Sequence, residues 1–228
     1  LINLKKIQEI DHIAKLFLFF SLLFILIKTT GSTSGYYDYF LYHDQAIKWI
    51  QKYPLVAGLG NINIRFIFNT SWFYPFAFTN IFFINTNFHV ISGFFFFLFI
   101  WHLLNNLQSK GKRINSLYIG HFLLLLSTMF MFRKILASTY YDMPVAVLCF
   151  IILLLAWEKA AKKTLLSFDS HSIIILFLSL TVFSIKFSSL PILVLPFMIF
   201  VSTLLKKQYY LSIKIVLLSL LFLIPWFA

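Results

Sequence analysis

The chain has 228 residues, of which 61% are apolar and only 11% are charged, and its mean hydropathy is +0.89. A water-soluble domain of this length could not bury so much apolar surface. Its apolar runs are continuous and do not alternate with polar residues, which excludes a transmembrane β-barrel. The sequence therefore predicts an all-α protein, a polytopic bundle of transmembrane helices.

The formal net charge of +12 is concentrated in short basic clusters, which predict the topology because short cytoplasmic loops favour lysine and arginine. Lysines before the first span, about Ala14 to Lys28, place the N-terminus inside. Three later basic loops are expected on the same inner face: Ser109–Arg113, Glu158–Lys163 and Lys206–Lys207.

The polar segment that follows the first span, residues 29–65, is predicted to be a long outer loop. Within it, apolar residues recur with a 3.6-residue period from Tyr39 to Tyr53, which is typical of an amphipathic helix on a membrane surface. Asp38 directly precedes this helix in an aromatic frame. Two roles stay open for its carboxylate: capping the helix, or chemistry.

The next segment, residues 66–84, is predicted to be re-entrant or interfacial, with the true second span at Phe88–Leu107. A net single crossing keeps all basic loops inside, and the polar residues and the proline of residues 66–84 need protein or water around them at membrane depth. The later spans, which bring the total to about seven crossings, are expected at Leu117–Met131, Met143–Trp157, Ser172–Ile185, Leu190–Leu205 and Leu211–Phe227. We expect residues 1–228 to be a single membrane domain and the N-terminal part of a longer protein, because the sequence lacks an initial methionine and stops inside an apolar run.

On this topology the outer face carries Asp38, Asp44 and Asp142. Asp142 lies just before Pro144, where a helix would restart, so capping is open for it as well. Lys186 interrupts an apolar stretch, and a charge at that depth indicates either phosphate binding, beside the neighbouring serines, or snorkelling to the headgroups. The histidines show no metal-ligand spacing, so no metal site is predicted.

The order of these features resembles the C-type glycosyltransferase superfamily, which includes the protein O-mannosyltransferases and the aminoarabinose transferase of lipid A. The stretch YDYFLYHDQAIKWIQKYPLVAGLGNINIRFIFNTSWF, with the later STYYDMP, SIKFSSLP and IPW, is also similar to a group of uncharacterised bacterial multi-spanning proteins. That similarity runs from about Asp38 to Trp226. It implies a multi-pass protein of a bacterial inner membrane.

The resemblance implies an inverting glycosyltransferase that moves a sugar from a polyprenyl-phosphate carrier to a glycan or lipid acceptor on the outer face. It implies that Asp38 is the catalytic base and Asp142 its assistant, that Lys186 and Arg65 bind the phosphate, and that His43 of the Leu-Tyr-His motif contacts substrate. Membrane lipids are the other expected partner, and nucleic acid is not one. Many relatives carry two adjacent acids in the first loop, whereas tyrosines flank Asp38, so metal dependence is not predicted.

Two other classes of function remain open. A carrier for a lipid-linked sugar or a small solute should show internal repeats with interrupted spans in both halves, and no such repeat is visible. A non-catalytic subunit of a polysaccharide assembly complex would not need outer acids or Lys186. Convergence of Asp38, Asp142 and Lys186 in the folded chain is expected only for the enzyme.

Overall fold

The computed structural model describes residues 19–20, 37–53, 58–62, 64–67, 70–82, 90–108, 120, 123, 127 and 138–227. All regular structure in these ranges is helical, which confirms the predicted all-α class. The predicted first span, the basic loop at 109–113 and the predicted span at 117–131 lie almost wholly outside them. The elements are η1 (π-helix, Tyr39–His43), α2 (Asp44–Lys52), α3 (Leu59–Ile62), η2 (3-10 helix, Ile64–Ile67), α4 (Phe73–Phe82), α5 (Val90–Gln108), α7 (Asp142–Ala161), α8 (Ser170–Ile185), η3 (3-10 helix, Phe187–Leu193), α9 (Val194–Leu205) and α10 (Tyr209–Phe227).

Helices coincide with the predicted apolar runs, since α5, α7, α8, α9 and α10 each begin and end within a few residues of a predicted span. Two helical stretches among the described residues are long and apolar enough to cross a membrane, Asp142–Ala161 and Phe187–Leu205. Between them α8 is shorter, and it packs against α7 on one side and α9 and α10 on the other.

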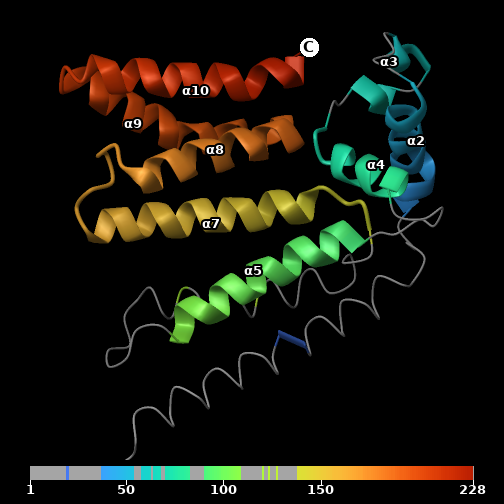
Figure 1. Ribbon diagram of the computed structural model, residues 1–228, viewed down its shortest axis with the longest axis horizontal. Coiled ribbons are helices and arrows are strands. Elements are labelled where there is room, and N and C mark those ends of the chain that lie inside the picture. Colours follow the sequence, from blue (N-terminus) through green and yellow to red (C-terminus); the bar gives the residue numbers. More distant parts are fainter. Residues whose placement is uncertain are drawn as a thin grey trace, which may run out of the picture.

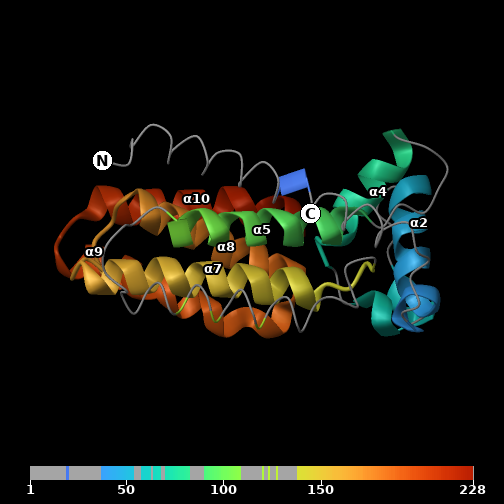
Figure 2. The same ribbon diagram turned by 90° about the horizontal axis from the view of Figure 1, so that it is seen from below.

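The long helices lie side by side, and the short helices α2, α3 and α4 gather at one end of them (Figures 1 and 2). Helices α7 and α5 begin at that end, where Ser92 Oγ donates a hydrogen bond of 2.5 Å to the carbonyl oxygen of Ser138. The α7–α8 and α9–α10 turns lie at the opposite end. We call these the cap end and the turn end of the bundle.

The two lysine-rich turns at the turn end share one backbone geometry. Lys163 and Lys207 both have φ of 56°, the left-handed conformation that commonly ends a helix. The next amide N–H in each turn bonds back to a carbonyl five residues earlier, from Thr164 to Lys159 at 2.8 Å and from Gln208 to Thr203 at 2.9 Å. Lysine charges here lie near helix C-termini, where the helix dipole favours cations.

Helix α4 spans ten residues, or about 15 Å at the α-helical rise, whereas the apolar core of a bilayer is about 30 Å thick. It packs against α2 in the cap rather than alongside the long helices (Figure 1). That the whole segment 66–84 does not cross stays a prediction, because part of it lies outside the described residues.

The cap is attached to the bundle by apolar packing and by polar contacts at the end of α8. Trp72 and Phe76 of the cap belong to one buried cluster with Ile152 of α7 and Val182 of α8. Thr70 Oγ1 donates a hydrogen bond of 2.7 Å to the last carbonyl of α8, and Ser189 Oγ donates to the carbonyl oxygen of Val182 at 3.0 Å. The Thr70 hydroxyl of the cap thus satisfies a carbonyl at the end of α8, whereas Ser189 of η3 adds a second donor to the carbonyl of Val182, which already accepts from the Lys186 N–H.

The capping role considered for Asp38 and Asp142 is wrong. The backbone of Asp38 is itself helical, with φ −66° and ψ −24°, and its side chain makes no capping hydrogen bond to η1 among the described residues. Asp142 is the first residue of α7, and no side-chain cap is present there either. Both carboxylates point to cations on other elements instead.

Candidate functional site

The cap end brings together all five residues that the sequence singled out. Arg65 of η2 donates from Nη1 to Asp38 Oδ1 at 3.2 Å, and Lys186, between α8 and η3, donates from Nζ to Asp142 Oδ1. His43 of η1 lies within electrostatic reach of Asp38, Arg65 and Asp142, whose charges all affect its pKa. Asp38 and Asp142 therefore share one site with the two cations predicted to bind phosphate.

Two tyrosines join the halves of this site, and sequence reasoning gave them no role. The phenol oxygens of Tyr42 and Tyr141 lie 3.3 Å apart. Arg65 Cζ lies 5.3 Å from the centre of the Tyr42 ring, and Lys186 Nζ lies 5.6 Å from the centre of the Tyr141 ring. Each cation is held between a carboxylate and the face of an aromatic ring, two environments that both favour positive charge.

The charged side chains of the site are partly exposed, whereas Tyr42 is buried beneath them and Tyr141 is partly buried. The side chains of Asp38, Arg65, Asp142 and Lys186 keep 34–40% of their surface exposed. Tyr42 belongs to the buried core, and burial together with the bond to Tyr141 raises the pKa of its phenol, so this group stays protonated. The site thus presents two cations, two carboxylates and the hydroxyl groups of two tyrosines.

The ring of His43 is buried within the site, so its contact with substrate stays a prediction. Its ring is 1% exposed, Nδ1 lies 2.7 Å from Thr139 Oγ1, and Nε2 has no hydrogen-bond partner among the described residues. Burial lowers its pKa to about 4, with opposing contributions from nearby carboxylates, so the imidazole is neutral at pH 7. The ring also packs against Phe73 and Tyr141, which fixes η1 against the start of α7.

This burial predicts a pH dependence of stability. The folded pKa of His43, about 4, lies below the unfolded value of 6.5, so the unfolded chain binds the proton more readily between these values. Stability should therefore fall as the pH drops from 6.5 to 4, by up to about 3 kcal/mol. Denaturant titration of the full chain in detergent, followed by tryptophan fluorescence, measures it. In His43→Gln the loss over this window should disappear; an unchanged loss would contradict the assignment to His43.

Asp44, the third acid predicted to lie on the outer face, has local partners. It forms an exposed ion pair with Lys48 at 2.6 Å, one helical turn later, and accepts a hydrogen bond from the Tyr39 phenol at 3.3 Å. Burial, followed by the charge of Asp44, raises the pKa of Tyr39 to about 12. This pair contacts neither cation of the site in the described structure.

The serines beside Lys186 differ from expectation. Ser184 Oγ donates to the carbonyl oxygen of Thr181 at 2.9 Å, and Ser189 Oγ donates to carbonyl oxygens of the same helix end. Their protons are used to close α8, whereas Ser188 is exposed. Of the three serines, Ser188 alone retains the exposure that a phosphate contact requires.

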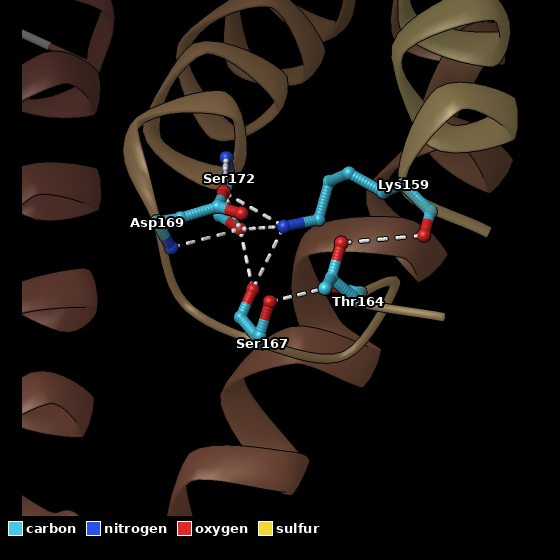
Figure 3. Close-up of polar contacts among 5 residues, drawn as sticks. All are labelled: Lys159, Thr164, Ser167, Asp169 and Ser172. Carbon is cyan, nitrogen blue, oxygen red and sulfur yellow. Dashed lines mark hydrogen bonds and ion pairs between the residues drawn. The ribbon is translucent and has the colours of Figure 1, made fainter. Parts of the chain in front are cut away.

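A second polar cluster lies at the turn end and was not predicted (Figure 3). The ammonium of Lys159, with 3% of its side chain exposed, donates to Asp169 Oδ1 at 2.7 Å, to Ser172 Oγ at 2.9 Å and to the carbonyl oxygen of Ser167 at 2.9 Å. Asp169 also caps α8 in a capping box with Ser172. Burial would raise the pKa of Asp169, but the hydrogen bonds from Lys159 and Ser172 outweigh it and lower the value. The ammonium of Lys159 has three oxygen acceptors within the cluster, which joins the end of α7 to the start of α8.

Comparison with known proteins identifies a family whose description names no activity. A family model described as "Domain of unknown function (DUF8201)" matches residues 2–228. No curated protein and no solved structure matches the chain. Among the described residues, no group of three or more histidine, cysteine, aspartate or glutamate side chains could hold a metal ion.

Proposed function

Because the chain belongs to the DUF8201 family, whose description names no activity, we propose its function from the cap-end site. The chain is a membrane glycosyltransferase that takes a sugar from a polyprenyl-phosphate carrier and passes it to a hydroxyl of a glycan or lipid at the outer face of a bacterial inner membrane. The observation that carries this proposal is the convergence of Asp38, Arg65, Asp142 and Lys186, from four separate segments, on one tyrosine pair.

The arrangement supports the division of roles that such a transfer needs. The substrate phosphate carries negative charge before transfer and gains more as the sugar leaves, so cations beside it stabilise the transition state. Lys186 and Arg65 are the two cations of the site. Asp38 is a partly exposed carboxylate that can accept the acceptor's hydroxyl proton as the new bond forms, and such general-base help is worth about 10²–10⁴ in rate. Direct displacement of the phosphate at the anomeric carbon would invert its configuration.

The ends of the bundle support the proposed membrane orientation. The lysine-rich turns that follow α7 and α9 share the turn end, and the acids and aromatic residues of the site share the cap end (Figure 1). The bias of inner loops toward positive charge places the turn end inside and the cap end outside. Exposed aromatic side chains on the cap, including Tyr37, Phe40 and Tyr53, suit the headgroup region.

This orientation predicts the pattern of cysteine labelling in intact cells. On a Cys149→Ala background, single cysteines at Tyr37 and Ser188 should react with a membrane-impermeant maleimide, because both positions are exposed at the cap end. Cysteines at Lys162 and Lys207 should react only after the cells are permeabilised. Labelling of Ser188 and Lys207 positions from the same side would contradict the orientation.

The test of the proposed function is a transfer assay with purified full-length protein, radiolabelled polyprenyl-phosphate sugars and a membrane extract as the source of acceptor. Sugar transfer that requires Asp38 supports the enzyme. Movement of the labelled lipid across a vesicle bilayer without transfer would favour the carrier. Neither transfer nor movement would favour the structural subunit.

A further inference from the structure

Among the described residues, two lysine–aspartate pairs join α7 to the two ends of α8, and they differ in how firmly the lysine is held. Lys159 is 3% exposed and has three oxygen acceptors around its ammonium (Figure 3). Lys186 is 36% exposed, and among the described residues its ammonium has one oxygen partner, Asp142, and one ring face, that of Tyr141. An ammonium can donate three hydrogen bonds, so Lys186 retains capacity for another anion.

Replacing Asp142 with another anion beside Lys186 should cost little free energy. Asp142 is itself 34% exposed, so water can solvate its carboxylate when the lysine turns away. Ion pairs with this exposure contribute little to stability, because solvent screens them. The face of the Tyr141 ring, whose centre lies 5.6 Å from Lys186 Nζ, is a favourable contact for the ammonium that does not depend on Asp142.

We propose that Asp142 is an internal counter-ion of Lys186 that competes with the phosphate of the lipid carrier, rather than an assistant to the base. This inference rests on the proposed function, since it names how the same site takes and releases its phosphate. The phosphate displaces Asp142 from Lys186 on binding, and the returning carboxylate repels the polyprenyl phosphate that remains after transfer. The counter-ion therefore weakens binding and favours product release.

The test measures binding of geranyl phosphate, a short isoprenyl monophosphate, to the full chain in detergent by tryptophan fluorescence. Geraniol, which lacks the charge, and inorganic phosphate, which lacks the chain, separate the lipid phosphate from a free anion. Asp142→Asn should lower the Kd for geranyl phosphate about two- to fivefold, because the competing carboxylate is gone. Lys186→Met should weaken binding of geranyl phosphate, leaving the contribution of Arg65, and in this background Asp142→Asn should no longer tighten binding as it does in the unmodified chain. Inorganic phosphate should follow the same order with weaker affinity.

Asp44→Asn is the matched control, because it removes one negative charge from the same end of the protein while leaving Lys186 untouched. Its Kd should remain that of the unmodified chain. If Asp142→Asn and Asp44→Asn lowered the Kd equally, net charge would explain the effect and the counter-ion role would be overturned. Weaker or unchanged binding of geranyl phosphate by Asp142→Asn would also overturn it. Asp142→Ser repeats the test should the amide disturb folding.

The inference and the proposed function fail separately. Sugar transfer by the unmodified chain together with weaker binding by Asp142→Asn would refute the counter-ion and leave the enzyme. Tighter binding by Asp142→Asn without any sugar transfer would refute the enzyme and leave an anion site governed by Asp142. Absence of geranyl phosphate binding to every variant would overturn both.

Discussion

Asp38→Asn should fold normally and lose about 10²–10⁴ of its sugar-transfer rate, because the amide cannot accept the acceptor's proton. The asparagine oxygen can still accept a hydrogen bond from Arg65 Nη1, which now donates to Asp38 Oδ1 at 3.2 Å. Donor binding should therefore change little. Initial rates of transfer and the KM for the labelled carrier, measured on the same preparation, separate the two effects.

Two further variants distinguish chemistry from position. The free energies of unfolding of Asp38→Ala and Asp38→Asn should differ by less than about 0.5 kcal/mol. The side chain of Asp38 makes no capping hydrogen bond, so alanine loses no cap that asparagine would keep. Arg65→Met keeps the carboxylate and removes the cation, so it should raise the KM for the phosphate-linked donor. An Asp38→Asn protein that folds and transfers sugar at a near-normal rate would contradict the catalytic assignment.

The positions of the helices could be predicted from the sequence because a single variable, the length of each apolar run, determines them. Helix α7 occupies Asp142–Ala161 where Met143–Trp157 was expected, and α8 occupies Ser170–Ile185 where Ser172–Ile185 was expected. The lysine-rich turns lie at the same end of the bundle because each of them follows a helix that starts at the cap end, and this alternation also follows from the order of the apolar runs. Neither inference requires knowledge of which side chains meet.

The partners of the charged residues could not be predicted in this way. Asp38 and Asp142 each precede or begin a helix, and local sequence offered capping as the simple explanation for both. Their cations lie 27 and 44 residues away along the chain. Pairing over such separations depends on how the cap docks on the bundle, which no local pattern encodes.

The sequence places Lys159 in the basic loop Glu158–Lys163, whereas the structure gives it an environment different from that of its neighbours. Lys162 and Lys163 are exposed, whereas Lys159 is buried because it faces the capping box at the start of α8. A lysine cluster at a helix end normally indicates solvated charge. The sequence signal for this burial was Asp169, because it follows Lys159 closely enough for one tight turn to bring the two side chains into contact.

Asp169→Asn should destabilise the protein more than Lys159→Met does, although both variants break the same ion pair. Asparagine preserves the helix cap but leaves the ammonium of Lys159 buried without a counter-charge. Removing one partner of a buried pair costs about 3–5 kcal/mol, and we expect about 2–4 kcal/mol here because Asp169 is 38% exposed. Lys159→Met removes the charge that needs compensation and keeps an apolar stem, so about 1–2 kcal/mol is expected from its lost hydrogen bonds.

The exposed ion pair of Lys48 and Asp44 is a matched control. Its distance from Nζ to the carboxylate oxygen is 2.6 Å, close to the 2.7 Å between Lys159 and Asp169. Asp44→Asn should cost less than about 0.5 kcal/mol, since an exposed pair one helical turn apart contributes little. Denaturant titration in detergent at pH 7 measures all three variants. Equal costs for Asp169→Asn and Asp44→Asn would contradict a buried pair.

The pH dependence provides an independent check of the same pair. The pKa of Asp169 is lower in the folded chain than its ordinary value of 3.8, so the unfolded chain takes up the proton first as the pH falls. The stabilisation from this group is complete above the unfolded pKa and is lost as the pH drops through the folded value. Acid unfolding below pH 3.8 should therefore become shallower in Lys159→Met, whose Asp169 lacks the ammonium. The loss assigned to His43 lies above pH 4 and should persist in that variant, because His43 sits at the opposite end of the bundle.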